Sequence, residues 1–194
     1  MCVSPWKVGF IGSAFFLGWC TTILWLPRLS DKYGRKKFFV VGMAIQLLLY
    51  TLLMVCESLD AMIALMFAFG MNCSIRINVG YIYLMELMPQ NKQTLVGTIW
   101  NIGEAMIYFM ATIYFWKISK DWYYIVLIGY FMTVFGFFGS LLLPESPRLL
   151  VELKRIDEAK CSLDTIARWN KKHLGFYLND FLQTSPKSTA QRND

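Results

Sequence analysis

The sequence predicts an all-α polytopic membrane protein. The chain of 194 residues is 56% apolar and only 16% charged, whereas a soluble domain averages about 25% charged residues. Long uncharged runs fill residues 1–143, and a polar region of mixed charge follows from Pro144. A short basic segment, residues 27–37, joins the first two apolar runs. Apolar runs separated by short charged loops are typical of helices that cross a membrane several times.

Five segments of the chain are long enough to cross a bilayer as helices. A hydrocarbon core of about 30 Å requires roughly 20 apolar residues in an α-helix. The segments that meet this requirement are residues 8–26, 38–56, 61–84, 94–116 and 122–143. Together they form a predicted transmembrane domain over residues 1–143. Because short loops join them, consecutive helices cross the membrane in opposite directions.

The basic loop between the first two segments predicts the orientation of the chain. It contains one acid, Asp31, and five cations: Arg28, Lys32, Arg35, Lys36 and Lys37. Short loops rich in Lys and Arg stay on the cytoplasmic side of a membrane. With this loop inside, most Lys and Arg outside the apolar segments also fall inside. We therefore expect a multi-pass integral membrane protein whose basic loops and carboxy-terminal tail are cytoplasmic.

The region after Pro144 predicts two further parts. Ser146 is a favourable N-cap residue, and Pro147 suits the first position of a helix. We therefore expect a cytoplasmic segment of amphipathic helices within residues 144–182, lying under the membrane helices. Residues 183–194 are polar, a composition typical of disordered tails, and we expect them to form one.

Composition and spacing argue against several other classes of function. The net charge of +6 could suit a nucleic-acid partner, but the cations lie in the loops and the tail, as in membrane proteins, so we expect no nucleic acid. The cysteines show no paired spacing, and His173 has no nucleophile or metal ligand nearby in the sequence. We therefore expect no metal, no cofactor, no disulfide framework and no catalytic site.

Two ionisable residues lie inside the predicted spans. Arg76 is roughly 12 Å, and Glu104 roughly 15 Å, from the inner end of its helix at 1.5 Å per residue. A charge at this depth costs about 3 kcal/mol, so each needs a partner or a watery cavity. One alternative is a buried ion pair that sets helix register. The other is a substrate or ion pathway, whose candidates on two polar faces are Arg76, Glu104, Asn72, Asn101 and Tyr108.

Small residues predict where helices approach closely. Gly9 with Ser13, and Gly136 with Gly139, give two such faces. Small side chains allow the backbones of membrane helices to come together. We expect close packing at both faces.

The loop from Asp31 to Lys37 resembles the loop between helices two and three of the major facilitator superfamily of secondary transporters. Two further motifs agree with this resemblance: Tyr83-x-x-Glu86-x-x-Pro89 after the third span, and Pro-Glu-Ser-Pro-Arg at residues 144–148. The tail after residue 148 resembles the organic cation/anion transporter branch, although sugar porters share much of the pattern. Two departures are Pro27, where the family has glycine, and Gln93, where the branch usually has arginine.

The resemblance covers residues 1 to about 172, and it implies that the five spans are helices two to six of a major facilitator bundle. Helix one and the carboxy-terminal half of the bundle would then be missing. In the family, charged helix ends on the cytoplasmic side clamp the two halves of the transporter. The residues that match this gate are Asp31, Gly34, Arg35, Lys36, Glu86, Glu145 and Arg148. For any one of them, the alternative is a solvated loop charge that only sets orientation.

The implied function is transport of a small organic solute by alternating access, with the lipid bilayer and the missing carboxy-terminal half as partners. The residues that suggest an organic ion porter suit a sugar porter nearly as well. The alternative from another class is a non-transporting membrane interaction protein, either a regulator of longer relatives or a truncated remnant. In either case we do not expect an enzyme.

Overall fold

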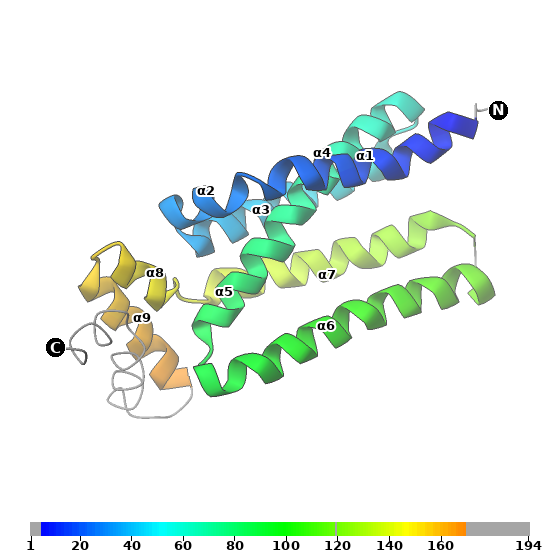
Figure 1. Ribbon diagram of the computed structural model, residues 1–194. Coiled ribbons are helices and arrows are strands. Elements are labelled where there is room, and N and C mark those ends of the chain that lie inside the picture. Colours follow the sequence, from blue (N-terminus) through cyan, green and yellow to red (C-terminus); the bar gives the residue numbers. More distant parts are fainter. Residues whose placement is uncertain (1–4, 119, 170–194) are drawn as a thin grey trace.

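The computed structural model describes residues 5–118 and 120–169, and these residues form helices joined by short turns (Figure 1). In chain order the helices are α1 (Pro5–Ile23), α2 (Leu26–Tyr33), α3 (Arg35–Val55), α4 (Leu59–Ser74), η1 (Ile75–Val79), α5 (Gly80–Leu87), α6 (Gln90–Ile113), η2 (Tyr114–Ile118), α7 (Trp122–Leu142), α8 (Pro147–Glu152) and α9 (Ile156–Trp169). The predicted all-α class is confirmed. His173 and the segment 170–194 lie outside the described residues.

The long helices correspond to the five predicted spans. Within the described part of the chain, three meet the length and apolarity of a membrane crossing: Arg35–Val55, Leu59–Leu87 and Trp122–Leu142. The second of these is one continuous helix built from α4, η1 and α5. Helices α1 and α6 are of similar length but are not among these three; α1 contains Lys7, and α6 begins with polar residues and contains Glu104.

The basic segment between the first two spans contains a short helix, α2, where the sequence predicted only a loop. Proline early in a helix removes no hydrogen bond, and α2 has one in its first turn. It ends at Gly34, whose φ of 103° lies in a region that favours glycine. The Gly34 amide donates to the Ser30 carbonyl at 3.1 Å. Helix α3 starts directly after this glycine.

Helices α1 and α4 approach each other with their backbones in contact. A methyl group added to Gly18 would lie 2.1 Å from the Phe67 carbonyl oxygen, and one added to Gly70 would lie 2.0 Å from that of Phe15. Of the glycines in the predicted small faces, Gly136 meets the Met43 side chain, whereas a methyl group added to Gly9 or Gly139 would have no neighbour within 4 Å among the described residues. Sequence spacing identifies small residues, but the helix crossing selects which of them face a neighbour.

Helix α3 lies at the centre of the packed part of the bundle, between α4–η1 on one side and α7 on the other (Figure 1). Its buried residues are Gly42, Met43, Gln46, Leu49 and Leu53. Glycines of α7 fit against this helix: Gly129 faces the Tyr50 hydroxyl and Gly136 faces the Met43 side chain.

Helix α6 packs much less than the others. It contacts the bundle mainly near its start, through α5, and Figure 1 shows it running alongside the other long helices towards the far end of the molecule. Side chains from Met106 to Met110 are 52–71% exposed. In an integral membrane protein such apolar side chains face lipid or another membrane helix.

Helices α8 and α9 lie against the end of the bundle formed by α2 and α5 (Figure 1). As predicted, Ser146 caps α8, and its hydroxyl accepts a hydrogen bond from the Leu149 amide at 3.3 Å. Helix α9 is amphipathic, with Ala159, Leu163 and Ala167 buried. Glu145, in the turn before α8, lies against the start of α3.

Candidate functional site

An arginine at the start of α3 connects three helices at this end of the bundle. The Arg35 guanidinium forms an ion pair with Glu86 of α5, and it also contacts Asp31 of α2 at 3.0 Å. The side chains of Arg35 and Glu86 are only 11% and 10% exposed, whereas that of Asp31 is 54% exposed. A buried ion pair is therefore central to the site, with Asp31 at its rim.

Glu145 binds the first turn of α3. Its Oε1 atom accepts hydrogen bonds from the backbone amides of Lys36 at 2.9 Å and Ser146 at 3.2 Å. A carboxylate at a helix N-terminus is favoured because the first amides lack partners in the helix and the helix dipole is positive there. The Lys36 ammonium donates to the Leu141 carbonyl at 3.1 Å. Residues 109 positions apart thus hold the α3 start against the end of α7.

Gly34 makes this approach possible. A methyl group at this position would lie 3.0 Å from the Glu145 Oε2 atom, and the φ of 103° is unfavourable for other residues. Glycine at position 34 is therefore favoured for two physical reasons: its backbone conformation and the closeness of the Glu145 carboxylate.

Two hydroxyl groups that the sequence did not assign to the site complete the network. The Ser146 hydroxyl donates to Glu86 Oε2 at 2.6 Å, so the carboxylate is bound by Arg35 on one side and by Ser146 on the other. The Ser162 hydroxyl of α9 donates to the Glu145 carbonyl at 2.5 Å. Ser146 could have been suspected from its place in the Pro-Glu-Ser-Pro-Arg motif, but the surroundings of Ser162 in the sequence give no signal.

Tyr83 and Arg148 lie at the edge of the same cluster. The Tyr83 hydroxyl donates to the Pro144 carbonyl, which links α5 to the segment before α8. Arg148 is half-buried on α8, near enough to Glu86 for their charges to interact. It makes no direct ion pair with any described residue. The structure therefore brings all seven predicted gate residues to one end of the bundle.

The predicted midspan residues do not form one site. Asn72 is 2% exposed and donates from Nδ2 to the Gly42 carbonyl at 3.0 Å and to Gln46 Oε1 at 2.6 Å. It therefore joins α4 to α3 inside the bundle. The Asn101 amide donates to the carbonyl of Gly97 in its own helix at 2.8 Å. Tyr108 is 71% exposed on the outer part of α6.

Arg76 lies in η1, a π-helical turn that the sequence did not predict. Such turns inside α-helices frequently occur at functional sites. Its guanidinium has one weak contact, 4.0 Å to the Cys73 sulfur, and its buried Nε atom has no hydrogen-bond partner. Within residues 5–118 and 120–169 no direct ion pair joins Arg76 to Glu104. The geometry therefore does not support the alternative of a register-setting ion pair.

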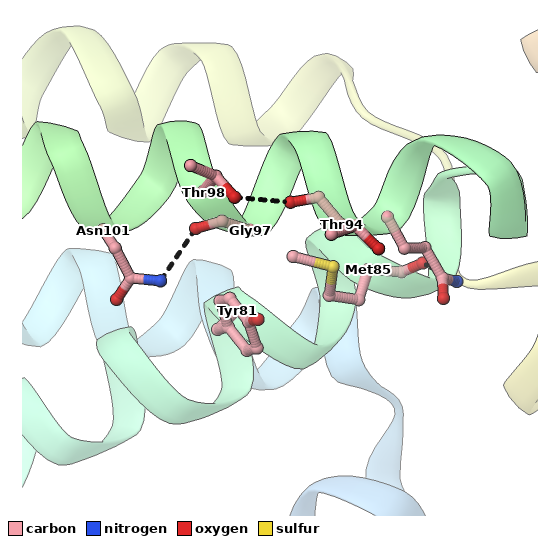
Figure 2. A pocket seen from close by; sticks show the side chains of 7 residues that line it. Tyr81, Met85, Thr94, Gly97, Thr98 and Asn101 are labelled. Atoms are coloured by element: carbon pink, nitrogen blue, oxygen red, sulfur yellow. Dashed lines mark hydrogen bonds between the residues drawn. The ribbon is translucent and has the colours of Figure 1, made fainter.

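A polar groove lies between α5 and the start of α6 (Figure 2), with a volume of about 480 Å³. It is lined by Tyr81, Met85, Gln93, Thr94, Gly97, Thr98 and Asn101. Gly97 allows Tyr81 and Met85 to come close, because a methyl group there would lie 3.1 Å from the tyrosine hydroxyl. Gln93, at the position where arginine was expected, donates to the Met85 carbonyl at 2.9 Å and so holds the α5–α6 turn.

Comparison with known proteins supplies the family. Residues 4–177 match the model of the family described as "Sugar (and other) transporter". The chain belongs to this family. The resemblance to the major facilitator superfamily expected from the sequence is thereby confirmed, and the chain is an integral membrane protein. Among the described residues, no group of three or more His, Cys, Asp or Glu side chains could hold a metal ion.

The chain is similar to curated proteins that carry different names. Synaptic vesicle glycoprotein 2B of Rattus norvegicus is 25% identical over 100% of this chain and 31% of its own length. The D-xylose transporter of Levilactobacillus brevis is 27% identical over 95% of the chain and 41% of its own length. Solute carrier family 22 member 4 of Mus musculus is 27% identical over 88% of the chain and 31% of its own length. The chain thus spans 31–41% of the length of these relatives.

Proposed function

We propose that this chain is part of a secondary transporter that moves a small organic solute across a membrane by alternating access. The observation that carries the proposal is the buried charge cluster at one end of the bundle, in a member of the transporter family. The cluster would act as the cytoplasmic gate, and midspan polar residues would line part of the solute pathway. The orientation follows from the basic composition of α2 and the start of α3.

The gate proposal rests on how Arg35 and Glu145 are bound. Exposed ion pairs contribute only about 0–1 kcal/mol each, but removing one partner of a buried pair costs about 3–5 kcal/mol. The Arg35–Glu86 pair belongs to the second class, since both side chains are about 10% exposed. A conformation that keeps this cluster together is favoured over one that separates it, and a solute that binds the second conformation better would shift the balance. Asp31, Lys36 and Arg148 would tune the same balance from the rim.

The pathway proposal rests on Arg76 and Glu104. Arg76 has no ion pair among the described residues, and a midspan charge costs about 3 kcal/mol in lipid. A polar solute or a water-filled cavity beside it would offset that cost. Glu104 lies one turn beyond Asn101 on α6, near enough for an electrostatic interaction with Cys73, whose sulfur contacts Arg76. Asn101 and Tyr108 are secondary candidates, whereas Asn72 would position the Arg76 helix.

A complete pathway would need more helices than this chain contains. Transporters of this superfamily enclose the solute between two bundles, and the matched region covers only 31% and 41% of two of the relatives. We propose a second bundle as partner, with the bilayer as the surrounding solvent. The 194-residue chain alone, purified and reconstituted into liposomes, is then expected to show no uptake above empty liposomes. Measurable uptake by the chain alone would contradict this part of the proposal.

The pathway is tested with the longest open reading frame that contains the chain, expressed in liposomes or cells. The probes are labelled D-xylose, niacin and an organic cation, chosen because relatives carry these names. Arg76→Gln and Glu104→Gln should each reduce uptake of the transported probe at least tenfold. Lys117→Gln, which removes an exposed cation at the end of η2, is the matched control. Unchanged uptake in both midspan variants would remove the two residues from the pathway.

The alternative is a non-transporting membrane protein, either a regulator of longer relatives or a truncated remnant. Sequencing the transcript separates the two hypotheses. Further predicted spans in frame support the transporter. Stop codons at both ends, together with co-purification of a full-length relative, support the regulator. Preference for D-xylose over the organic cation would favour a sugar porter over an organic ion porter.

A further inference from the structure

The outward face of α2 carries cations that nothing in the described structure neutralises. Arg28 and Lys32 are exposed and lie one helical turn apart, and Lys37 is exposed in the first turn of α3. The opposite face of α2 is packed against the bundle, with Leu26 and Ser30 buried. Within residues 5–118 and 120–169 none of the three cations forms an ion pair. We call Arg28, Lys32 and Lys37 the α2 basic face.

The charged neighbours of this face have other partners. Asp31, the acid on α2, is bound by Arg35 at 3.0 Å. Arg35 itself is held by Glu86, and the Lys36 ammonium donates to the Leu141 carbonyl. Glu145 accepts from backbone amides. The local field at the outward side of α2 is therefore positive and comes from the three exposed cations.

The depth of the face follows from α3. This helix is one of the three apolar enough to span a membrane, and it starts at Arg35, so Lys37 stands immediately before its apolar stretch. The start of such a helix lies at the level of the lipid headgroups. Two exposed aromatic side chains flank the face, Trp25 at 44% and Tyr33 at 58% exposure. Trp and Tyr concentrate at this level of a bilayer because their rings are amphipathic.

The other cationic surface at this end is different. Arg155, directly before α9, pairs with Glu158 at 2.5 Å, and Arg168 of α9 pairs with Asp164 at 2.6 Å. Acids of the same helix thus cancel much of its positive charge. The α2 basic face lacks such internal compensation.

We propose that the α2 basic face binds the phosphate headgroups of anionic phospholipids in the surrounding membrane. Three cations at headgroup depth, next to two aromatic rings, fit a lipid with a net negative headgroup better than a zwitterionic one. Each Lys or Arg near an anionic membrane surface contributes about 1 kcal/mol, which is roughly a fivefold change in association. The proposal does not depend on transport, because it concerns only the described chain and its lipids.

The experiment titrates the purified 194-residue protein in a neutral detergent with phosphatidylglycerol or phosphatidylcholine of the same acyl chains, and counts bound lipids by native mass spectrometry. The wild-type protein is expected to prefer phosphatidylglycerol, and rising salt should weaken this preference because exposed charges are screened. The variant Arg28→Gln/Lys32→Gln/Lys37→Gln should lose roughly a hundredfold in association with phosphatidylglycerol. Its association with phosphatidylcholine should not change.

The matched control is Lys117→Gln/Lys120→Gln/Lys160→Gln, which removes the same charge from other exposed positions. It should bind phosphatidylglycerol as the wild type does. Equal losses of phosphatidylglycerol binding in both triple variants would show that only net charge matters, and would overturn the proposal. The proposal would also be overturned if soluble glycerol phosphate competed for the protein as well as phosphatidylglycerol does. Helix content by circular dichroism checks folding. If the triple variant does not fold, the single variants Arg28→Gln and Lys32→Gln decide, each with a fivefold loss expected and no loss contradicting the proposal.

Discussion

The two polar regions of this protein, the charged end of the bundle and the midspan residues, differ in how their groups are satisfied. At the end, Glu86 is bound by both Arg35 and Ser146, and Glu145 by two backbone amides. At midspan, Arg76 has one weak contact with a sulfur. Both arginines have a buried Nε atom without a hydrogen-bond partner, but Arg35 has two carboxylate partners in the described chain and Arg76 has none. Interactions among the described residues provide no partner for the charge of Arg76, in agreement with the proposal that Arg76 faces a solute or a water-filled cavity.

The largest effect is expected from Arg35→Gln. This change leaves the Glu86 carboxylate buried without its cation, so the free energy of unfolding should fall by about 3–5 kcal/mol. The measurement is an SDS titration of the purified protein in detergent. Lys92→Gln, an exposed cation at the start of α6, is the control and should change stability by less than about 0.5 kcal/mol. Equal losses of unfolding free energy in the two variants would show that the burial of Arg35 does not matter for stability.

Gly34→Ala should have the next largest effect. Alanine is unfavourable at a φ of 103°, and its methyl group would lie 3.0 Å from Glu145 Oε2. Backbone strain of this kind should lower the free energy of unfolding by about 1–3 kcal/mol. Displacement of Glu145 would also free the Lys36 amide, which should then exchange its hydrogen faster. Gly9→Ala, at a glycine with no neighbour within 4 Å, is the control. A Gly34 variant as stable as wild type, with unchanged exchange at Lys36, would show that the glycine has no steric role.

Ser146→Ala tests the link between α8 and the buried ion pair. The change removes the cap of α8 and the hydroxyl that donates to Glu86. Loss of an N-cap costs about 1 kcal/mol, and we expect a total of about 1–2 kcal/mol in the same titration. Ser146→Asp would keep a cap acceptor but place a second carboxylate beside Glu86, and it should be less stable than Ser146→Ala. The reverse order would argue against the Ser146–Glu86 contact.

Arg76→Gln should have the smallest effect on stability. Because Arg76 lacks an ion pair among the described residues, removing its charge should leave the unfolding free energy within about 0.5 kcal/mol of wild type or raise it slightly. The same SDS titration measures it. A loss of about 3 kcal/mol, as expected for Arg35→Gln, would mean that Arg76 belongs to a buried ion pair after all. The contrast between the two regions would then fail.

Much of the fold follows from the sequence. The free-energy cost of placing backbone polar groups and charged side chains in lipid depends only on the residues of each segment, so each segment can be judged by itself. The five long helices match the predicted spans within a few residues, and the cap at Ser146 and Pro147 is where the local pattern places it. The seven residues proposed for the gate were also identified by motif, and the structure places them at one end of the bundle. Their identities are visible in the sequence because each stands at a helix end next to an apolar run.

The less successful predictions depended on contacts between distant segments. Asn72 shares a helical face with Arg76 in the sequence, yet it binds α3 inside the bundle. Gly18 and Gly70 form the close crossing of α1 and α4, where Gly9 with Ser13 had been expected to provide a small contact face. The π-helical turn at Arg76 also has no sequence signal here. Each of these features depends on which face of a helix meets its neighbour.

The sequence by itself determined that the protein is helical, lies in a membrane and belongs to a transporter superfamily. These conclusions rest on the solvation of each segment and on short motifs, which need no knowledge of other segments. Only the tertiary structure decided that Glu145 binds the amide of Lys36, 109 residues away, that Arg35 and Glu86 are buried together, and that Arg76 is left without an ion pair in the described chain. The physical reason is that pairing energy depends on distance and burial in space, which the order of residues does not specify.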